Sequence, residues 1–158
     1  MRTLSLSPMN RFAEFGPLVV RIIAGIIMAT HGFQKLQAGP GNFGGFLAQL
    51  GVPLPTLMGY VVTLVELLGG ILLIIGLFSR LAALLLTIDL GVAILLVKVN
   101  VGLIAPPQQG AGAELDLALI AGFLVILFAG PGSVSLDRAL GIEEGVAQSS
   151  APRRVRRR

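Results

Sequence analysis

The 158-residue sequence contains no cysteine and no tryptophan, and its only histidine is His31. Without cysteine the chain cannot form a disulfide, a CxxC redox centre, a thiolate zinc site or a cysteine-ligated iron–sulfur cluster. A single histidine also excludes a bis-histidine haem that this chain would hold alone. The sequence offers no flavin motif either, so we expect no haem, flavin or iron–sulfur cluster in this chain.

Charged residues are also scarce in this sequence. They make up 13% of the chain, whereas hydrophobic residues make up 54% and the mean hydropathy is +0.88. An ordinary soluble domain carries about 25% charged residues, so a soluble globular protein is nearly excluded. A membrane-spanning helix needs about 20 apolar residues, and four runs approach this length. We therefore predict an all-α integral membrane four-helix bundle in the lipid bilayer, with spans at residues 17–36, 56–78, 81–97 and 113–130.

The segment between the first two predicted spans is rich in glycine and proline, which break a regular span. Four apolar residues in this segment have the i, i+3, i+4, i+7 spacing of a short amphipathic helix, namely Phe43, Phe46, Leu47 and Leu50. Such a helix would lie in the membrane interface or fold over the bundle, and a partly buried loop is the alternative. In the second span, the pair Gly69-Gly70 indicates a close contact between helices.

Lysine and arginine outside the spans are distributed unevenly between the two sides of the membrane. If both termini share one side, the other side holds only Lys35 and Lys98. The side with the termini then holds Arg2, Arg11, Arg80, Arg138, Arg153, Arg154, Arg156, Arg157 and Arg158. The excess of basic residues on cytoplasmic loops places both termini in the cytoplasm. We therefore expect a multi-pass protein of the inner (plasma) membrane.

This orientation divides the chain into three parts. Residues 1–16 form a cytoplasmic N-terminal segment, residues 17–140 the transmembrane domain, and residues 141–158 a basic cytoplasmic tail that we expect to be disordered. Because the basicity belongs to the tail rather than to a folded face, we interpret it as an orientation determinant. We expect no nucleic-acid partner.

Ionisable side chains inside the apolar spans are the most informative residues. An ionised group at the bilayer centre costs at least about 2.5–3.5 kcal/mol unless it is paired or hydrated. A rise of about 1.5 Å per residue places Arg21 and Asp89 in the inner half of the membrane. We predict that these two form a structural ion pair, which would lock the first span against the third.

A second group of ionisable residues lies nearer the outer face and supplies the catalytic candidates. The same helical rise places five residues from three helices at similar depth in the membrane, namely His31, Lys35, Glu66, Glu114 and Asp116. His31 and Lys35 are four residues apart and so share one face of the first span. His31 and Glu66 could exchange a proton near neutral pH. The alternative is a buried hydrogen-bonded network that holds the helices in register.

A metal site is chemically conceivable but is not expected here. One imidazole and two carboxylates, from His31, Glu66 and Asp116, suit iron or manganese. However, a di-iron carboxylate bundle needs a Glu-x-x-His motif on each of two helices, and one histidine cannot supply both.

Several short segments match a known family in their order and spacing. They are Arg21 and Gly25, the run His31 to Lys35, the run Glu66 to Gly70, the run Gly76 to Arg80, Glu114, and the run Gly130 to Asp137. With these segments the chain resembles the DoxX family of small four-helix bacterial membrane proteins over about residues 17–140. The resemblance implies a four-helix bundle in the inner membrane. Members are commonly labelled oxidoreductases, and some are associated with quinone-linked sulfur oxidation or with resistance to quinones and thiol stress. The arginine-rich tail is not part of the family pattern.

Three functions are compatible with these residues. The first is a quinone-linked oxidoreductase or a membrane subunit of one, in which His31 with Glu66 serves one ring oxygen and Lys35 or Asp116 the other. Its electrons would come from a redox partner protein or a bound reductant. The second is a non-catalytic anchor for a partner enzyme. The third is a carrier of protons or small solutes, which would have to form a homo-oligomer to enclose a pathway.

Overall fold

The computed structural model describes residues 15–106 and 110–143. Most of the predicted N-terminal segment and of the predicted basic tail lies outside these residues. Within the described ranges the chain is helical and contains no strand. The helices are α1 (Gly16–Ala38), α2 (Pro40–Gln49), α3 (Pro55–Ile75), α4 (Ser79–Leu96), the 3-10 turn η2 (Lys98–Asn100), α5 (Glu114–Ala129) and α6 (Leu136–Ala139).

Three of these helices are long and apolar enough to cross a membrane, namely α1, α3 and α4. They coincide with the first three predicted spans to within a few residues. Only 28% to 33% of the apolar window in each helix is buried inside the protein. Large side chains such as Ile23, Leu68 and Leu95 are exposed on the outer faces, as expected for surfaces that contact lipid. The chain is therefore a membrane protein.

The fourth predicted span is also helical. It corresponds to α5, which begins at Glu114 and ends at Ala129. Its 16 residues fall short of the about 20 that a perpendicular crossing needs, so its crossing of the bilayer stays a prediction.

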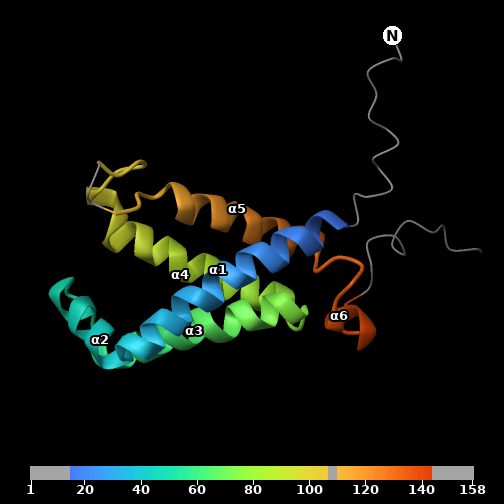
Figure 1. Ribbon diagram of the computed structural model, residues 1–158, viewed down its shortest axis with the longest axis horizontal. Coiled ribbons are helices and arrows are strands. Elements are labelled where there is room, and N and C mark those ends of the chain that lie inside the picture. Colours follow the sequence, from blue (N-terminus) through green and yellow to red (C-terminus); the bar gives the residue numbers. More distant parts are fainter. Residues whose placement is uncertain (1–14, 107–109, 144–158) are drawn as a thin grey trace, which may run out of the picture.

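The long helices pack in a ring in which α1 contacts α3, α3 contacts α4, α4 contacts α5 and α5 contacts α1. The core between them includes Met28, Leu73, Leu86 and Phe123, all almost fully buried. Figure 1 shows that the α1/α3 pair and the α4/α5 pair lie close at the end that carries α6 and diverge toward the end that carries α2. The ring places α1 and α4 across a diagonal from each other.

Glycine allows α1 and α3 to approach at backbone distance. A Cβ atom added at Gly70 would collide with the backbone of Ala29, and one added at Gly32 would collide with the backbone of Leu67. Gly69 faces the side chain of Leu86 on α4. The sequence-based expectation that Gly69 and Gly70 make close helix contacts is therefore confirmed. Small residues permit this packing because lipid provides no hydrophobic force between helices.

Arg21 is fully buried at the α6 end and makes a different contact from the one expected. Its guanidinium donates from Nη1 to the carbonyl of Pro131 at 2.8 Å and from Nη2 to the carbonyl of Val134 at 2.7 Å. The predicted Arg21–Asp89 ion pair is wrong. The physical reason is the ring order, since α1 and α4 are diagonal partners and Arg21 extends instead toward the segment after α5.

The turn between α3 and α4 is held by Asp137 at the start of α6. The Asp137 carboxylate accepts hydrogen bonds from the backbone N–H groups of Phe78 at 2.6 Å and Ser79 at 2.9 Å. Phe78 adopts a left-handed backbone with φ 49°, and the carboxylate satisfies N–H groups that the start of α4 leaves unpaired. Gly76 adopts φ 73° beside the Arg21 guanidinium, where a Cβ would collide with Nη1. We call Arg21, Asp137 and this turn the α6 clasp.

Candidate functional site

Lys35 and Glu66 form an ion pair between α1 and α3. The Lys35 Nζ atom lies 2.5 Å from the Glu66 Oε1 atom, and the side chain of Glu66 is only 5% exposed. Lys35 stands near the end of α1 and reaches inward along its flexible four-carbon stem. Its ammonium also lies 4.7 Å from the centre of the Phe43 ring, which favours a cation–π contact with α2. The pair therefore connects three helices.

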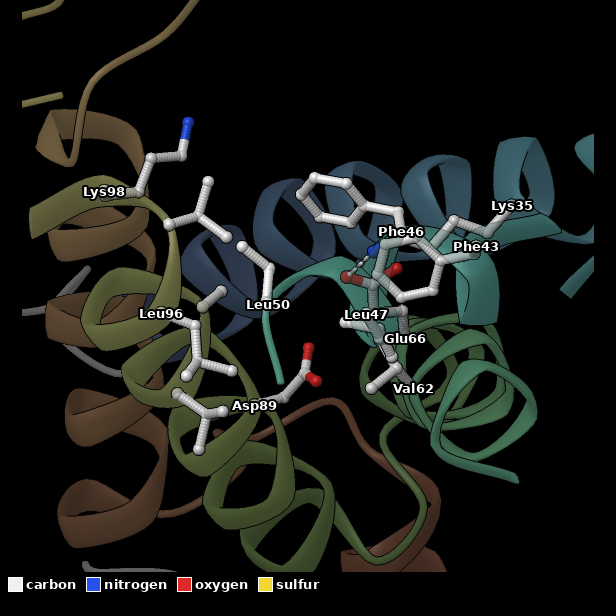
Figure 2. A pocket seen from close by; sticks show the side chains of 13 residues that line it. Lys35, Phe43, Phe46, Leu47, Leu50, Val62, Glu66, Asp89, Leu96 and Lys98 are labelled. Carbon is white, nitrogen blue, oxygen red and sulfur yellow. Dashed lines mark hydrogen bonds and ion pairs between the residues drawn. The ribbon is translucent and has the colours of Figure 1, made fainter. Parts of the chain in front are cut away.

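Asp89 belongs to the same site and approaches it from α4. The carboxyl group of Asp89 lies near that of Glu66, and both Glu66 and Lys35 interact with it electrostatically. Figure 2 shows the carboxyl groups of Asp89 and Glu66 directed into one cavity from opposite sides. The site thus combines one ammonium and two carboxyl groups. The helical-rise argument had placed Asp89 with Arg21 in the inner half of the membrane, whereas the structure places Asp89 with Glu66 and Lys35.

These three residues line a cavity of about 170 Å³ between α3 and α4 at the α2 end of the ring. The rest of its lining is almost entirely apolar and comprises Phe43, Phe46, Leu47, Leu50, Val62, Val92, Ala93, Leu96 and Val97, together with Lys98. An engineered apolar cavity of about 150 Å³ binds benzene. The cavity is therefore large enough for one six-membered ring.

The Oε2 atom of Glu66 is buried and has no hydrogen-bond partner in the described part of the chain. A buried acceptor without a partner loses the hydrogen bonds that water would give it, so such atoms are rare in folded proteins. Since Oε1 is occupied by Lys35, Oε2 is the atom that Glu66 offers to a guest in the cavity.

The structure brings together only some of the five predicted catalytic candidates. Lys35 and Glu66 meet, but His31 is exposed and its Nδ1 lies 3.0 Å from the carbonyl oxygen of Ile27 on its own helix. Glu114 is exposed at the start of α5. Neither His31 nor Glu114 lines the cavity.

Asp116 also lies outside the cavity lining, although it is half-buried and its Oδ2 atom has no partner among the described residues. The charged groups that act on it come from three elements and are Lys98, His31, Glu114 and Lys35. The predicted cluster is therefore divided. Lys35 and Glu66 join Asp89 in the cavity, while Asp116 lies outside its lining and shares Lys35 and Lys98 with it as charged neighbours.

Besides Asp89, sequence reasoning missed two contributors to the site, the aromatic side chains of α2 and Lys98. The spacing of Phe43, Phe46, Leu47 and Leu50 predicted an amphipathic helix and left open what it would cover. The structure shows that helix as α2, with these residues facing the cavity. Lys98 was counted only as a loop charge, but it lines the cavity and its Nζ donates to the carbonyl of Ala111.

Comparison with known proteins identifies the family. The sequence profile of DoxX matches residues 16–99, which is more than half of the chain. This chain belongs to the DoxX family. The matched range extends from α1 to η2, so all four ionisable residues of the cavity lining lie within it, namely Lys35, Glu66, Asp89 and Lys98.

Relatives of this DoxX chain cover most of its length. "Putative oxidoreductase CatD" of Bacillus subtilis is 35% identical over 129 residues, which is 82% of this chain and 90% of the relative. The membrane protein Rv3486 of Mycobacterium tuberculosis is 33% identical over 81% of this chain and 84% of its own length. "Inner membrane protein YphA" of Escherichia coli is 29% identical over 81% of this chain and 96% of its own length. No solved structure matches the chain.

Proposed function

We propose that this DoxX-family protein is a quinone-linked oxidoreductase of the inner membrane, or the membrane subunit of an oxidoreductase complex, and that its cavity binds the quinone ring. The observation that carries the proposal is the cavity itself, which has the size of one ring and a lining that is apolar apart from Lys35, Glu66, Asp89 and Lys98. The names of two relatives support it, since one refers to an oxidoreductase and another to the inner membrane.

The residues present fit a quinone in three respects. The cavity volume of about 170 Å³ matches one ring, and Phe43 and Phe46 offer aromatic faces for contact. The buried Oε2 of Glu66 lacks a partner and would gain one from a ring substituent. Val92 and Leu96 line the cavity and are also exposed on the outer surface of α4, which would let an apolar tail continue into lipid.

In this proposal the side chains bind the ring and handle its protons. A bound quinone supplies two-electron, two-proton redox chemistry, with the electrons coming from a redox partner protein. Glu66 and Asp89 give protons to the ring or take them from it at their carboxyl oxygens, and Lys35 holds the Glu66 carboxyl group in place. The apolar residues of α2 and α4 surround these groups.

We also propose that α5 crosses the bilayer beside the other three long helices, so that the protein is a four-helix bundle with both termini in the cytoplasm. Arg80 and Arg138 lie at the α6 end, whereas Lys35 and Lys98 lie toward the α2 end. With the arginines of the tail added, basic residues favour the cytoplasm for the α6 end. The cavity would then lie in the outer half of the membrane.

A binding experiment tests the quinone proposal directly. The full-length protein in lipid nanodiscs is titrated with duroquinone, whose ring is fully substituted and so does not alkylate lysine, in its oxidised and reduced forms. We expect saturable binding of at least one form. Ala93→Leu should abolish it, because the added side chain occupies the cavity. The matched control is Gly91→Leu on the same helix, because a Cβ at Gly91 meets no atom within 4 Å.

Two results would overturn the proposal. One is the absence of saturable binding for both redox forms in a folded sample. The other is undiminished binding in the Ala93→Leu variant, since a guest that tolerates the filled cavity must bind elsewhere. Stable copurification of a soluble redox enzyme together with the first result would favour a non-catalytic anchor.

A further inference from the structure

Each of the two ammonium groups that line the cavity already donates one hydrogen bond to the protein. The Lys35 ammonium donates to Glu66 Oε1 at 2.5 Å and lies over the Phe43 ring. The Lys98 ammonium donates to the carbonyl of Ala111. The remaining lining residues, apart from the two acidic ones, are apolar and have no side-chain donor. An ammonium has three N–H groups, so the lysines keep some donor capacity, but no buried donor of the lining is left without a partner in the described part of the chain.

The carboxyl groups of the cavity, in contrast, include a buried atom that has no partner in the described part of the chain. Glu66 Oε2 is buried without a partner, and the Asp89 carboxyl group faces the same space. If Asp89 is ionised, both carboxyl groups act only as acceptors. If Asp89 carries a proton, its one O–H can be given to neighbouring Glu66, and its other oxygen is still an acceptor. If that proton is shared with Glu66, the unused hydrogen-bonding capacity of the two carboxyl groups is that of an acceptor in either state.

Oxidised and reduced quinones differ in this property. The oxidised ring carries two carbonyl oxygens, which only accept hydrogen bonds, whereas the reduced ring carries two hydroxyl groups, which also donate them. An oxidised ring would leave a carboxyl oxygen without a donor and would place its own oxygen near it. That carboxyl oxygen is Glu66 Oε2 or, when Asp89 gives a proton to Glu66, the other oxygen of Asp89. A reduced ring would donate a hydrogen bond from one of its hydroxyl groups to that carboxyl oxygen. Hydrogen bonds to ionised carboxylates are among the stronger kinds.

We propose that the cavity selects the reduced, hydroxyl-bearing form of the quinone over the oxidised form through the open acceptors of Glu66 and Asp89. This inference rests on the proposed function. It has a thermodynamic consequence for the bound couple, because tighter binding of the reduced form raises the midpoint potential. A tenfold preference corresponds to a rise of about 30 mV for a two-electron couple. The site would thereby make the bound quinone a better electron acceptor than the same quinone in free lipid.

Equilibrium dialysis tests the preference. Full-length protein in nanodiscs is dialysed without oxygen against duroquinone or against durohydroquinone kept reduced with dithionite, and each dissociation constant is measured by absorbance. We expect the reduced form to bind about tenfold more tightly or better, because a buried charged acceptor left unpaired is costly. In Glu66→Gln and in Asp89→Asn the preference should fall toward one, since each amide adds an N–H donor that suits the oxidised ring.

The matched control is Glu143→Gln. Glu143 lies at the α6 end, where it accepts from Arg80 Nε at 2.8 Å, and the amide keeps an acceptor oxygen there. This variant should retain the wild-type preference. If Glu66→Gln fails to fold, Asp89→Asn carries the same test, because Asp89 is not held in the ion pair with Lys35.

The outcomes separate this inference from the proposed function. Saturable binding of both forms with equal affinity, or tighter binding of the oxidised form, overturns the inference and leaves the quinone site in place. A wild-type preference that survives in both Glu66→Gln and Asp89→Asn also overturns it, because the acceptors would then not be its cause. Failure of both forms to bind overturns the proposed function itself.

Discussion

Lys35 of α1 and Glu66 of α3 are joined by an ion pair in which Nζ and Oε1 lie 2.5 Å apart. The pair stands where the two helix backbones approach most closely through glycine, four residues or fewer from Gly32 and Gly70 in sequence. It therefore serves two roles at once. It links the packing of α1 on α3 to the polar side of the cavity, and it fixes the position of the carboxyl group that we propose to contact the ligand.

Removal of Lys35 should destabilise the protein strongly. Lys35→Met leaves the Glu66 carboxylate buried without its counter-charge, and breaking such a pair costs about 3 kcal/mol or more. The double variant Lys35→Met with Glu66→Met should recover much of this loss, because it removes both charges and keeps the side-chain volume. Unfolding free energies measured by SDS titration of the detergent-solubilised protein test this. Equal stability of Lys35→Met and wild type would contradict a buried ion pair.

Arg21 and Asp89 should act independently of each other. Arg21→Met loses the hydrogen bonds to Pro131 and Val134 at the α6 end, each worth about 1.5–3 kcal/mol for a charged donor. Asp89→Asn changes a residue of the cavity near the middle of α4, away from the α6 end. In a double-mutant cycle on unfolding free energy, the coupling between these substitutions should lie within about 0.5 kcal/mol of zero. A coupling above 1 kcal/mol, on the order expected of contacting residues, would restore the ion pair predicted from the sequence.

The glycine contact between α1 and α3 should not tolerate even a methyl group. Gly70→Ala would press a Cβ against the backbone of Ala29, and overpacking of this kind costs about 1–3 kcal/mol. The matched control Gly91→Ala makes the same chemical change on α4, where the added atom meets open space. We expect Gly91→Ala to equal or slightly exceed wild type in stability. Similar behaviour of the two variants in the same unfolding titration would argue against the close approach of the helices.

His31 should be dispensable for ligand binding, in contrast to Glu66. Its side chain is exposed and bonded to the carbonyl of Ile27, outside the cavity lining. His31→Ala should therefore change the dissociation constant for duroquinone less than twofold in either redox form, whereas Glu66→Gln should change it about tenfold in the reduced form. A loss of binding in His31→Ala as large as that in Glu66→Gln would return His31 to the site.

The amphipathic spacing from Phe43 to Leu50 shows what a local sequence pattern can predict about structure and what it cannot. Periodicity identified an apolar helix face, and the structure forms α2 at that position. It could not say whether that face meets lipid or protein, because both are apolar and give the same sequence signal. Only the divergence of the α1/α3 and α4/α5 pairs creates the space that α2 covers.

The placement of Asp89 shows the same limit for charged residues. Helical rise gives the depth of a residue along its own helix, and by depth Asp89 lies between Arg21 and Glu66. Which of them it meets depends on which helices are neighbours in the ring. Since α4 packs on α3 and lies across from α1, Asp89 joins Glu66. The family-matching segments were a better guide to contacts in the α6 clasp than helical depth was for Asp89. Three of these segments meet there, through Arg21, Gly76 and Asp137.

By itself, the sequence determined that this chain enters a membrane as long apolar helices, where those helices begin and end, and which ionisable residues they carry into it. These properties follow from composition and local periodicity, which act within one helix at a time. The tertiary structure decided that Lys35, Glu66 and Asp89 share one cavity and that His31 does not. That outcome depends on which helices are neighbours and on how each helix is rotated about its axis. Small residues and buried polar contacts determine both, and these contacts form only when the helices pack together.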